Sequence, residues 1–240
     1  MTTDSMLDPC PVELRVGAEL GATRSGGLDG RHHFSFAAWQ RPDRLEWGTL
    51  RALNEYRLEP GAARPPSFHS GFDILTLVTG GRLRRLGNYA SRRLLEAGSA
   101  ELISAGRGVD LGVEAVGKEP ATYVEIWLRT GPGRREPRRE WRPQAMESLT
   151  VPIAEGPKAL DGALRMRAKG RIHRAALAAH RRTELALGEG ECAYLSIGKG
   201  EVRANGVAGQ AGDGLAVSGP GVLEIRADKA SELLIVVSAG

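Results

Sequence analysis

The chain has 240 residues, and 33 Lys and Arg against 29 Asp and Glu give it a formal net charge of +4. Cys10 and Cys192 are far apart and form no C-x-x-C pair, which excludes a disulfide scaffold and a cysteine-based zinc site. The apolar run Leu233–Val237 is far shorter than the roughly 20 residues of a membrane helix, and Met1–Pro11 shows no secretory signal, so we expect a cytoplasmic protein.

Glycine and proline are spread along the chain, with 32 Gly and 13 Pro, which favours many short strands joined by turns. The most regular run is ATYVEIWLR at Ala121–Arg129. Its alternation places Val124, Ile126 and Leu128 on one face and Tyr123, Glu125 and Trp127 on the other. The strands expected in the first half are Leu50–Leu58, Asp73–Thr79, Arg82–Leu86, Ala100–Ser104 and Ala121–Arg129.

Composition changes at Gly131–Pro143, where five arginines and three prolines show no strand pattern. We therefore expect a linker or arm over residues 131–148, between an N-terminal domain of residues 1–130 and a C-terminal domain of residues 149–240. Ala175–Arg182 has helical propensity, but the surrounding rhythm favours a strand edge. Strands are expected at Ala163–Lys169, Arg171–Ala178, Thr183–Leu187, Ala193–Ile197, Glu201–Ala204, Leu215–Val217, Val222–Ala227 and Leu233–Val237.

The two halves share an ordered set of motifs. In the first, a strand and the turn Gly80-Gly81 precede Ala97-Gly98 and then the run Ile103–Val109 (ISAGRGV). In the second, a strand and a glycine turn precede Ala211-Gly212 and then Val217–Val222 (VSGPGV). Matching order and spacing predict two copies of one β-domain, and antiparallel domains of this rhythm close as jelly rolls, a class that includes cupins.

Several segments resemble the pirin family. Leu28–Ala37 (LDGRHHFSFA) is similar to a family segment that reads W-x-T-F-S-F-A, and Leu50–Gly61 to L-R-V-x-N-x-D-x-x-x-P-G. Phe68–Thr76 (FHSGFDILT) resembles the end of H-P-H-x-G-F-E-x-[IV]-T, and Ile103–Val109 resembles M-[ST]-A-G-x-G-[IV]. Gly188–Val237 resembles the C-terminal cupin of bacterial members. The resemblance implies an all-β bicupin with two jelly-roll barrels.

The resemblance also implies a divalent metal, usually iron, held by H-x-H on one strand and H-x-E on another. Residues i and i+2 of a strand share a face, so two such pairs supply three imidazoles and a carboxylate. In this chain the four positions are Ser67, His69, Leu111 and Val113, and only His69 keeps a ligand. The resemblance thus places a degenerate metal site in the N-terminal barrel.

Two carboxylates lie close to these positions in the sequence. Asp110 precedes the expected ligand by one residue and should point away from the cavity, because a one-residue slip reverses the face of a strand. Asp73 has the same parity as His69, so we count Ser67, His69, Asp73, Leu111 and Val113 as candidate cavity residues. A non-standard metal site around His69 with Asp73 or Asp110 stays open.

The other notable side chains have structural interpretations. We expect His32 and His33 to be structural, His173 and His180 to lie on solvated strand or loop faces, and Cys192 to be inert core. The arginine cluster Arg134–Arg142 is interleaved with glutamates, which favours a solvated arm with local ion pairs over a site for acidic partners or phosphate. The modest, dispersed positive charge does not indicate nucleic-acid binding.

Three functions are compatible with the sequence, one of them a protein-interaction role through the arginine arm. The first is a non-catalytic ligand-sensing or interaction protein, with no cofactor expected and a possible small molecule in the N-terminal barrel; the protein partner is unknown. The alternative is a metal-dependent oxidoreductase of the quercetin 2,3-dioxygenase type, as the resemblance implies. The lost ligands favour the first, because function depends on the site rather than the fold.

Overall fold

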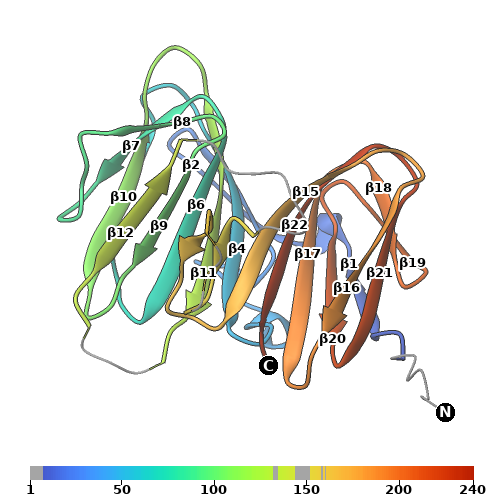
Figure 1. The fold of residues 1–240 in the computed structure, drawn as a ribbon. Coiled ribbons are helices and arrows are strands. Elements are labelled where there is room, and N and C mark those ends of the chain that lie inside the picture. Colours follow the sequence, from blue (N-terminus) through green and yellow to red (C-terminus); the bar gives the residue numbers. More distant parts are fainter. Residues whose placement is uncertain (1–7, 132–134, 144–151, 158, 160) are drawn as a thin grey trace.

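The computed structural model of the protein describes residues 8–131, 135–143, 152–157, 159 and 161–240. Two antiparallel β-barrels stand side by side, each built from a seven-stranded and a four-stranded sheet (Figure 1). This architecture confirms the prediction of an all-β bicupin. The helices among the described residues are short 3-10 turns at Gly17–Glu19 and Pro42–Arg44, and none of them could cross a membrane.

In the first half the seven-stranded sheet has the order β12-β9-β6-β11-β4-β3-β2, and the four-stranded sheet has the order β5-β10-β7-β8. We call the seven-stranded sheets the inner sheets and the four-stranded sheets the outer sheets. The strands are β2 (Gly21–Ser25), β3 (Leu28–His32), β4 (Leu50–Leu58), β5 (Ala63–His69), β6 (Phe72–Gly80), β7 (Arg82–Leu86), β8 (Leu94–Glu96), β9 (Ala100–Ser104), β10 (Val109–Ala115), β11 (Ala121–Arg129) and β12 (Arg138–Arg142).

The second half repeats this plan, with the inner sheet β1-β20-β17-β22-β15-β13-β14 and the outer sheet β16-β21-β18-β19. Its strands are β1 (Val12–Arg15), β13 (Ala154–Glu155), β14 (Leu164–Arg165), β15 (Gly170–Leu177), β16 (Arg182–Leu187), β17 (Glu191–Lys199), β18 (Glu201–Ala204), β19 (Val207–Gln210), β20 (Gly214–Ser218), β21 (Gly221–Ala227) and β22 (Ser231–Ala239).

The strand orders confirm the duplication. The series β9-β6-β11-β4 corresponds to β20-β17-β22-β15, and β5-β10-β7-β8 corresponds to β16-β21-β18-β19. Gly108, the residue before β10, and Gly221, the first residue of the equivalent strand β21, both have φ of 146°. L side chains rarely adopt this conformation, so the repeated Gly-Val step in the sequence reflects a backbone requirement shared by the two copies.

Each inner sheet is completed at one edge by a strand from outside its own repeat. β1, near the start of the chain, pairs with β20 of the second half, although the sequence groups it with the first domain. β12 pairs with β9 of the first half, although we expected a linker there. β12 and β1 attach to the open edges of β9 and β20 by backbone hydrogen bonds. Such pairing does not require alternating apolar residues, so the sequence pattern did not reveal it.

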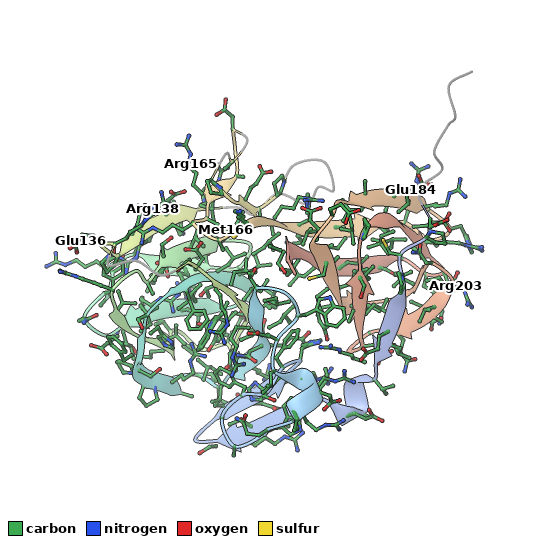
Figure 2. The ribbon with its side chains drawn as sticks, turned by 90° about the horizontal axis from the view of Figure 1, so that it is seen from below. Glu136, Arg138, Arg165, Met166, Glu184 and Arg203 are labelled. Atoms are coloured by element: carbon green, nitrogen blue, oxygen red, sulfur yellow. The ribbon has the colours of Figure 1, made fainter. Side chains whose placement is uncertain are left out.

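The arginine-rich arm is held by local contacts. Arg138 forms an ion pair with Glu140, its guanidinium donates to the carbonyl of Arg165, and Arg107 forms an ion pair with Glu136. Glu136, Arg138 and Arg165 lie along one edge of the molecule (Figure 2). The pair Arg138–Glu140 lies within the arm, whereas Glu136 pairs with Arg107 of the first half and Arg139 with Glu101, so the expected solvated arm with local ion pairs is found only in part. Residues 132–134 and 144–148 of the expected linker lie outside the described residues.

The two inner sheets pack face to face through a shared apolar core. Leu75, Leu102 and Ile126 of the first half belong to the same buried cluster as Tyr194 and Val236 of the second. Burial of this seam removes apolar surface of both halves from water, which favours their association. The interior of the second barrel is a separate apolar cluster that includes Leu195, Ile197, Val202, Leu215, Leu223 and Ile235.

Asp73 joins the halves through a pair of polar contacts. Its Oδ2 accepts hydrogen bonds from the backbone N–H groups of Arg167 and Ala168, at 2.5 and 2.7 Å. The side chain is buried, so water cannot replace these bonds. Asp73 is thus directed toward the second half and not into the N-terminal barrel, which corrects its assignment as a cavity residue.

We predict that Asp73→Ala lowers the free energy of unfolding by about 1–3 kcal/mol, because two buried N–H groups lose their acceptor. Urea denaturation of both proteins would measure the difference. Asp161→Ala, at an exposed turn, is the matched control and should leave the unfolding midpoint unchanged. Equal stability of the two variants would contradict a structural role for Asp73.

Candidate functional site

Strands β5 and β10 bring the expected ligand positions close together, with Ser67 exposed and His69, Leu111 and Val113 buried in the first barrel. Their register places Ser67 opposite Leu111 and His69 opposite Val109, and Ser67 Oγ lies 3.1 Å from His69 Nε2. The register shifts between Leu111 and Val113, where β5 carries an extra residue. The register thus brings Ser67, His69 and Leu111 close together, and the assignment of these positions as the family's ligand positions stays a prediction.

His69 is 9 % exposed, and its ring meets the Trp127 ring edge to face, with centroids 4.7 Å apart. Burial lowers the pKa of His69; the negative charge of Glu125 opposes this shift, while the positive charges of Arg64 and Arg85 add to it. His69 is therefore held as a neutral imidazole among charged neighbours.

Leu111 and Val113 fill the space on the opposite strand. Leu111 belongs to a buried apolar cluster with Ile74 and Ile103, and Val113 is fully buried in the adjoining cluster of the same barrel. Two of the four family ligand positions are thus occupied by packed hydrocarbon.

Asp110 lies on the outer face, as the parity of the strand predicts. It is opposite the exposed Phe68, and its carboxylate accepts a hydrogen bond from Asn88 Nδ2 at 2.9 Å. With Asp73 directed toward the second half, neither aspartate can join His69 in a site.

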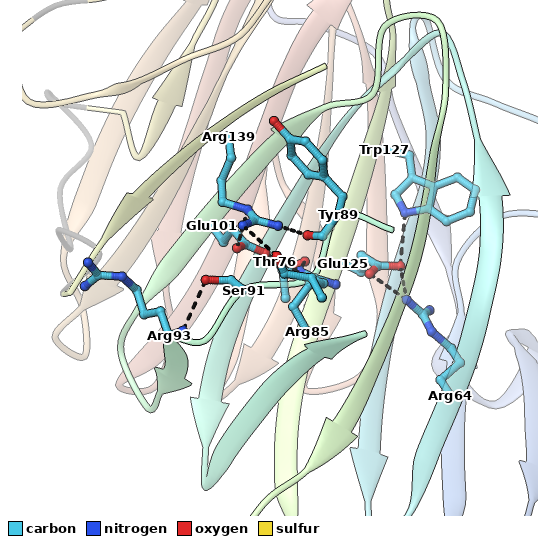
Figure 3. A network of polar contacts seen from close by, with 11 residues as sticks. Arg64, Thr76, Arg85, Tyr89, Ser91, Arg93, Glu101, Glu125, Trp127 and Arg139 are labelled. Carbon is cyan, nitrogen blue, oxygen red and sulfur yellow. Dashed lines mark hydrogen bonds and ion pairs between the residues drawn. The ribbon is translucent and has the colours of Figure 1, made fainter. Parts of the chain in front are cut away.

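The interior contains a buried ion pair that the sequence did not reveal. Arg64 Nη2 donates to both oxygens of Glu125, at 2.7 and 2.8 Å, and Trp127 Nε1 donates to the same carboxylate at 3.1 Å (Figure 3). The guanidinium carbon of Arg64 also lies 4.8 Å from the centre of the Tyr56 ring. Burial alone would raise the pKa of Glu125, but the charge and hydrogen bonds of Arg64 lower it overall, so Glu125 is ionised.

A second buried pair lies beside the first. Arg85 donates to Glu101 Oε2 from Nε and Nη2, at 2.8 and 2.6 Å, and to Thr76 Oγ1 at 2.9 Å (Figure 3). Arg139 of β12 forms an ion pair with the other oxygen of Glu101 at 3.2 Å. The strand that we expected to be a linker thus supplies part of the charge inside the first barrel.

One cross-strand relation connects these pairs to the family ligand positions. Val113 stands opposite Arg64 on β5 and opposite Arg85 on β7. Side chains of directly opposed residues share a face of the sheet, so both guanidinium groups flank the position where the family resemblance expected a glutamate. The sequence offered one signal for these ion pairs, namely a charged residue at a position where the strand alternation points into the barrel, such as Glu125 between Tyr123 and Trp127. The arginine that pairs with Glu125 could not be identified from the sequence.

Comparisons with known proteins agree with this architecture. The profile described as "Pirin" matches residues 14–128, and the profile described as "Quercetinase C-terminal cupin domain" matches residues 154–236. The chain belongs to the pirin family. PA1210 of Pseudomonas aeruginosa, provisionally named a quercetin 2,3-dioxygenase, is 33% identical over 230 residues, which cover 94% of this chain and 98% of that protein.

Other pirin relatives extend the comparison. The pirin-like protein of Caulobacter vibrioides is 30% identical over 224 residues, 92% of this chain and 97% of its own. The crystal structure of the Escherichia coli pirin YhhW in complex with nickel(II) superposes with a TM-score of 0.89 at 27% identity, over 95% of this chain and 99% of that one. A relative with this fold therefore binds a divalent metal.

The donor set of this pirin does not fit such a metal. No group of three or more His, Cys, Asp or Glu side chains suited to a metal ion occurs within the part of the chain that the structure describes. Around His69 the other positions are a hydroxyl and two hydrocarbons, and the nearby carboxylate of Glu125 is already bound to Arg64. Transition-metal sites in proteins use about three or four ligands, so one imidazole is insufficient.

The remaining histidines and cysteines are structural. His32 hydrogen-bonds Thr23 and Asn54, both at 2.9 Å, and His33 contacts Tyr194 and Glu55, at 2.9 and 3.3 Å. His180 lies in an exposed turn as expected, and Cys10 and Cys192 are free and buried. His173 differs from expectation: it is buried on β15, because the alternation of this strand directs its odd-numbered residues into the second barrel.

We predict that the Arg64–Glu125 pair behaves as a coupled unit. Glu125→Gln or Arg64→Met alone should cost about 3–5 kcal/mol, because each leaves a buried charge without its partner. The double variant should cost much less than the sum, since both charges are then absent. Denaturant unfolding of all four proteins would measure the coupling, and additive effects would show that the two side chains do not interact.

The pH dependence of stability should report on His69. Because burial lowers its pKa, the folded state resists protonation that the unfolded chain accepts below about pH 6.5. The stability contribution is therefore complete above that pH and is lost as the pH falls toward the lower folded-state pKa. Urea unfolding at pH 7.5 and 5.5 should show a smaller loss for His69→Gln than for the parent, whereas His180→Gln should match the parent.

Proposed function

We propose that this pirin is a cytoplasmic binding module that works without a catalytic metal. The observation that carries the proposal is the position of Val113, which is packed between Arg64 and Arg85 where the family resemblance expected a glutamate ligand. A metal beside His69 would add a cation to an interior in which the carboxylates of Glu125 and Glu101 are already bound to arginines, so neither carboxylate is available to neutralise it. Glu125 and Glu101 cannot serve as metal ligands, because each would then leave its arginine partner without a counter-charge.

The ligand proposed for the first barrel is a planar small molecule. The half-buried Trp127 ring has Phe36 and Phe72 as neighbours, with ring centroids 5.4 and 5.7 Å apart, in addition to His69. Phe68, 66 % exposed, packs over Gly108 close to the same strands. Aromatic surfaces of this kind favour flat apolar partners through stacked and edge-to-face contacts.

The alternative is a metal-dependent oxidoreductase of the quercetin 2,3-dioxygenase type. It is favoured by the name of an Escherichia coli relative, quercetin 2,3-dioxygenase, which is 27% identical over 226 residues. The alternative requires a metal at His69, and the donor set described above does not supply one. We therefore rank the binding role first.

The metal content of the purified protein tests this choice. We expect far less than one iron, nickel or zinc per chain after incubation with each metal and gel filtration, with the nickel-binding Escherichia coli pirin treated in parallel as the positive control. Ser67→His/Leu111→His/Val113→Glu, which restores the family ligands, should gain metal. One metal per chain in the parent, lost in His69→Ala, would favour the dioxygenase.

Quercetin provides a second test that separates binding from turnover. We expect quercetin to quench tryptophan fluorescence in a saturable way, to lose most of this effect in Trp127→Phe, and to be recovered intact with no oxygen consumed. Trp141→Phe, on the edge strand β12, is the matched control and should keep the quenching. Oxygen consumption that depends on His69 would contradict the binding role.

A further inference from the structure

A cavity of about 460 Å³ lies between the two inner sheets, away from the interior of either barrel. Strands β3, β4, β6 and β11 of the first half form one wall, and β15, β17 and β22 of the second form the other. Leu77, Val124 and Leu234 belong to the apolar seam and also line the cavity, so the cavity adjoins the seam. Its volume is typical of small-molecule sites, which span roughly 300–1,000 Å³.

Strand register arranges the wall of the first half in a row. Arg31 is opposite Glu55, Glu55 is opposite Val124, and Val124 is opposite Leu77. Across the cavity, Leu234 of β22 offers a third apolar surface. The row therefore places a guanidinium and a carboxylate side by side at one end of an apolar floor.

A chain of hydrogen bonds that crosses the seam between the two halves holds the side chain of Glu55 in place. Its Oε1 accepts from Ser196 Oγ at 3.0 Å and from His33 Nε2 at 3.3 Å, while Tyr194 OH donates to His33 Nδ1 at 2.9 Å. Burial favours the neutral acid, but the hydrogen bonds of His33 and Ser196 and the charge of Arg31 together lower the pKa of Glu55. The carboxylate is ionised, and no hydrogen bond from the described residues engages Oε2.

Arg31 is the cation that accompanies this carboxylate. It is exposed, and no ion pair within 4.0 Å joins it to any residue that the structure describes. Its guanidinium reaches the turn at Gly212 of the second half, where a side chain would collide with it. The other charges of the cavity wall have ion-pair partners: Arg57 with Glu59, Asp29 with Arg24, and Arg174 with Glu232.

We propose that this cleft is a binding site for a free α-amino acid with an apolar side chain. The ligand carboxylate would pair with Arg31, its ammonium group with Glu55 Oε2, and its side chain would lie on Leu77, Val124 and Leu234. The ammonium and carboxylate groups of an α-amino acid are bonded to the same carbon atom, so both can reach charges on neighbouring strands. Charged hydrogen bonds in such a site are about twice as strong as neutral ones, which favours an ammonium group over a hydroxyl. The site is independent of any metal and of quercetin binding.

The test uses the full chain and a matched ligand series followed by isothermal titration calorimetry. L-phenylalanine is the probe, 3-phenyllactate replaces its ammonium group by a hydroxyl, and phenethylamine lacks its carboxylate. We expect saturable binding of L-phenylalanine, and binding of each analogue weaker by about tenfold or more, because each leaves one charge of the cleft without its partner.

Variants locate the site. Arg31→Met and Glu55→Gln should each weaken L-phenylalanine binding by about tenfold or more, and Thr122→Trp, which fills the cleft without altering its charges, should abolish it. Arg92→Met and Glu189→Gln, exposed and outside the cleft, are the charge-matched controls and should bind as the parent does. Thermal melting of each variant checks that it is folded. Glu55→Gln alters the seam between the halves, so if this variant is unfolded the test relies on Arg31→Met.

Any of four results would overturn the proposal. The first is the absence of saturable L-phenylalanine binding, and the second is binding that survives both Arg31→Met and Thr122→Trp. The third is equal affinity for 3-phenyllactate, which would show that Glu55 does not recognise an ammonium group. Binding lost only in Trp127→Phe would place the ligand at the first barrel and also exclude the cleft. None of these results changes the metal content or the fate of quercetin, so the two proposals fail separately.

Discussion

Two buried guanidinium–carboxylate pairs organise the first barrel. Removing a charge from water costs several kcal/mol, and a pair such as Arg64–Glu125 persists in an interior only because short, directed hydrogen bonds offset that cost. Each partner then fixes the other, and Arg85 and Glu101 repeat the arrangement next to it. The carboxylates of Glu125 and Glu101 are bound to arginines and are not free to act as ligands, so the same interaction that stabilises the barrel leaves His69 without an acidic partner for a metal.

The two halves show that one duplicated fold can hold interiors that differ in their buried ion pairs. Equivalent strands surround an apolar cluster in the second barrel and the ion pairs in the first. Backbone pairing is common to both, so the difference depends only on the side chains at inward-facing positions. The first barrel is therefore the half whose core contains these two buried ion pairs.

The seam between the halves is the second functional region. The edge strand β1, the contacts of Asp73 and the chain from Tyr194 through His33 to Glu55 all cross it. These bonds hold the walls of the cleft in position before any ligand arrives, which reduces the entropy lost on binding. Exchange of edge strands thus stabilises the bicupin and also pre-organises the surface between its barrels.

The sequence by itself determined the all-β class and the duplication, because alternation, glycine turns and short motifs are local and repeat with the chain. From the family resemblance it also predicted a degenerate metal site at Ser67, His69, Leu111 and Val113, which stays a prediction. Only the tertiary structure decided that Arg64 binds Glu125, that Asp73 faces the second half, and that a strand within Gly131–Pro143 completes the first sheet. Those outcomes depend on which distant residues share a face or an open sheet edge, and a single strand's pattern contains no information about its partner across the barrel.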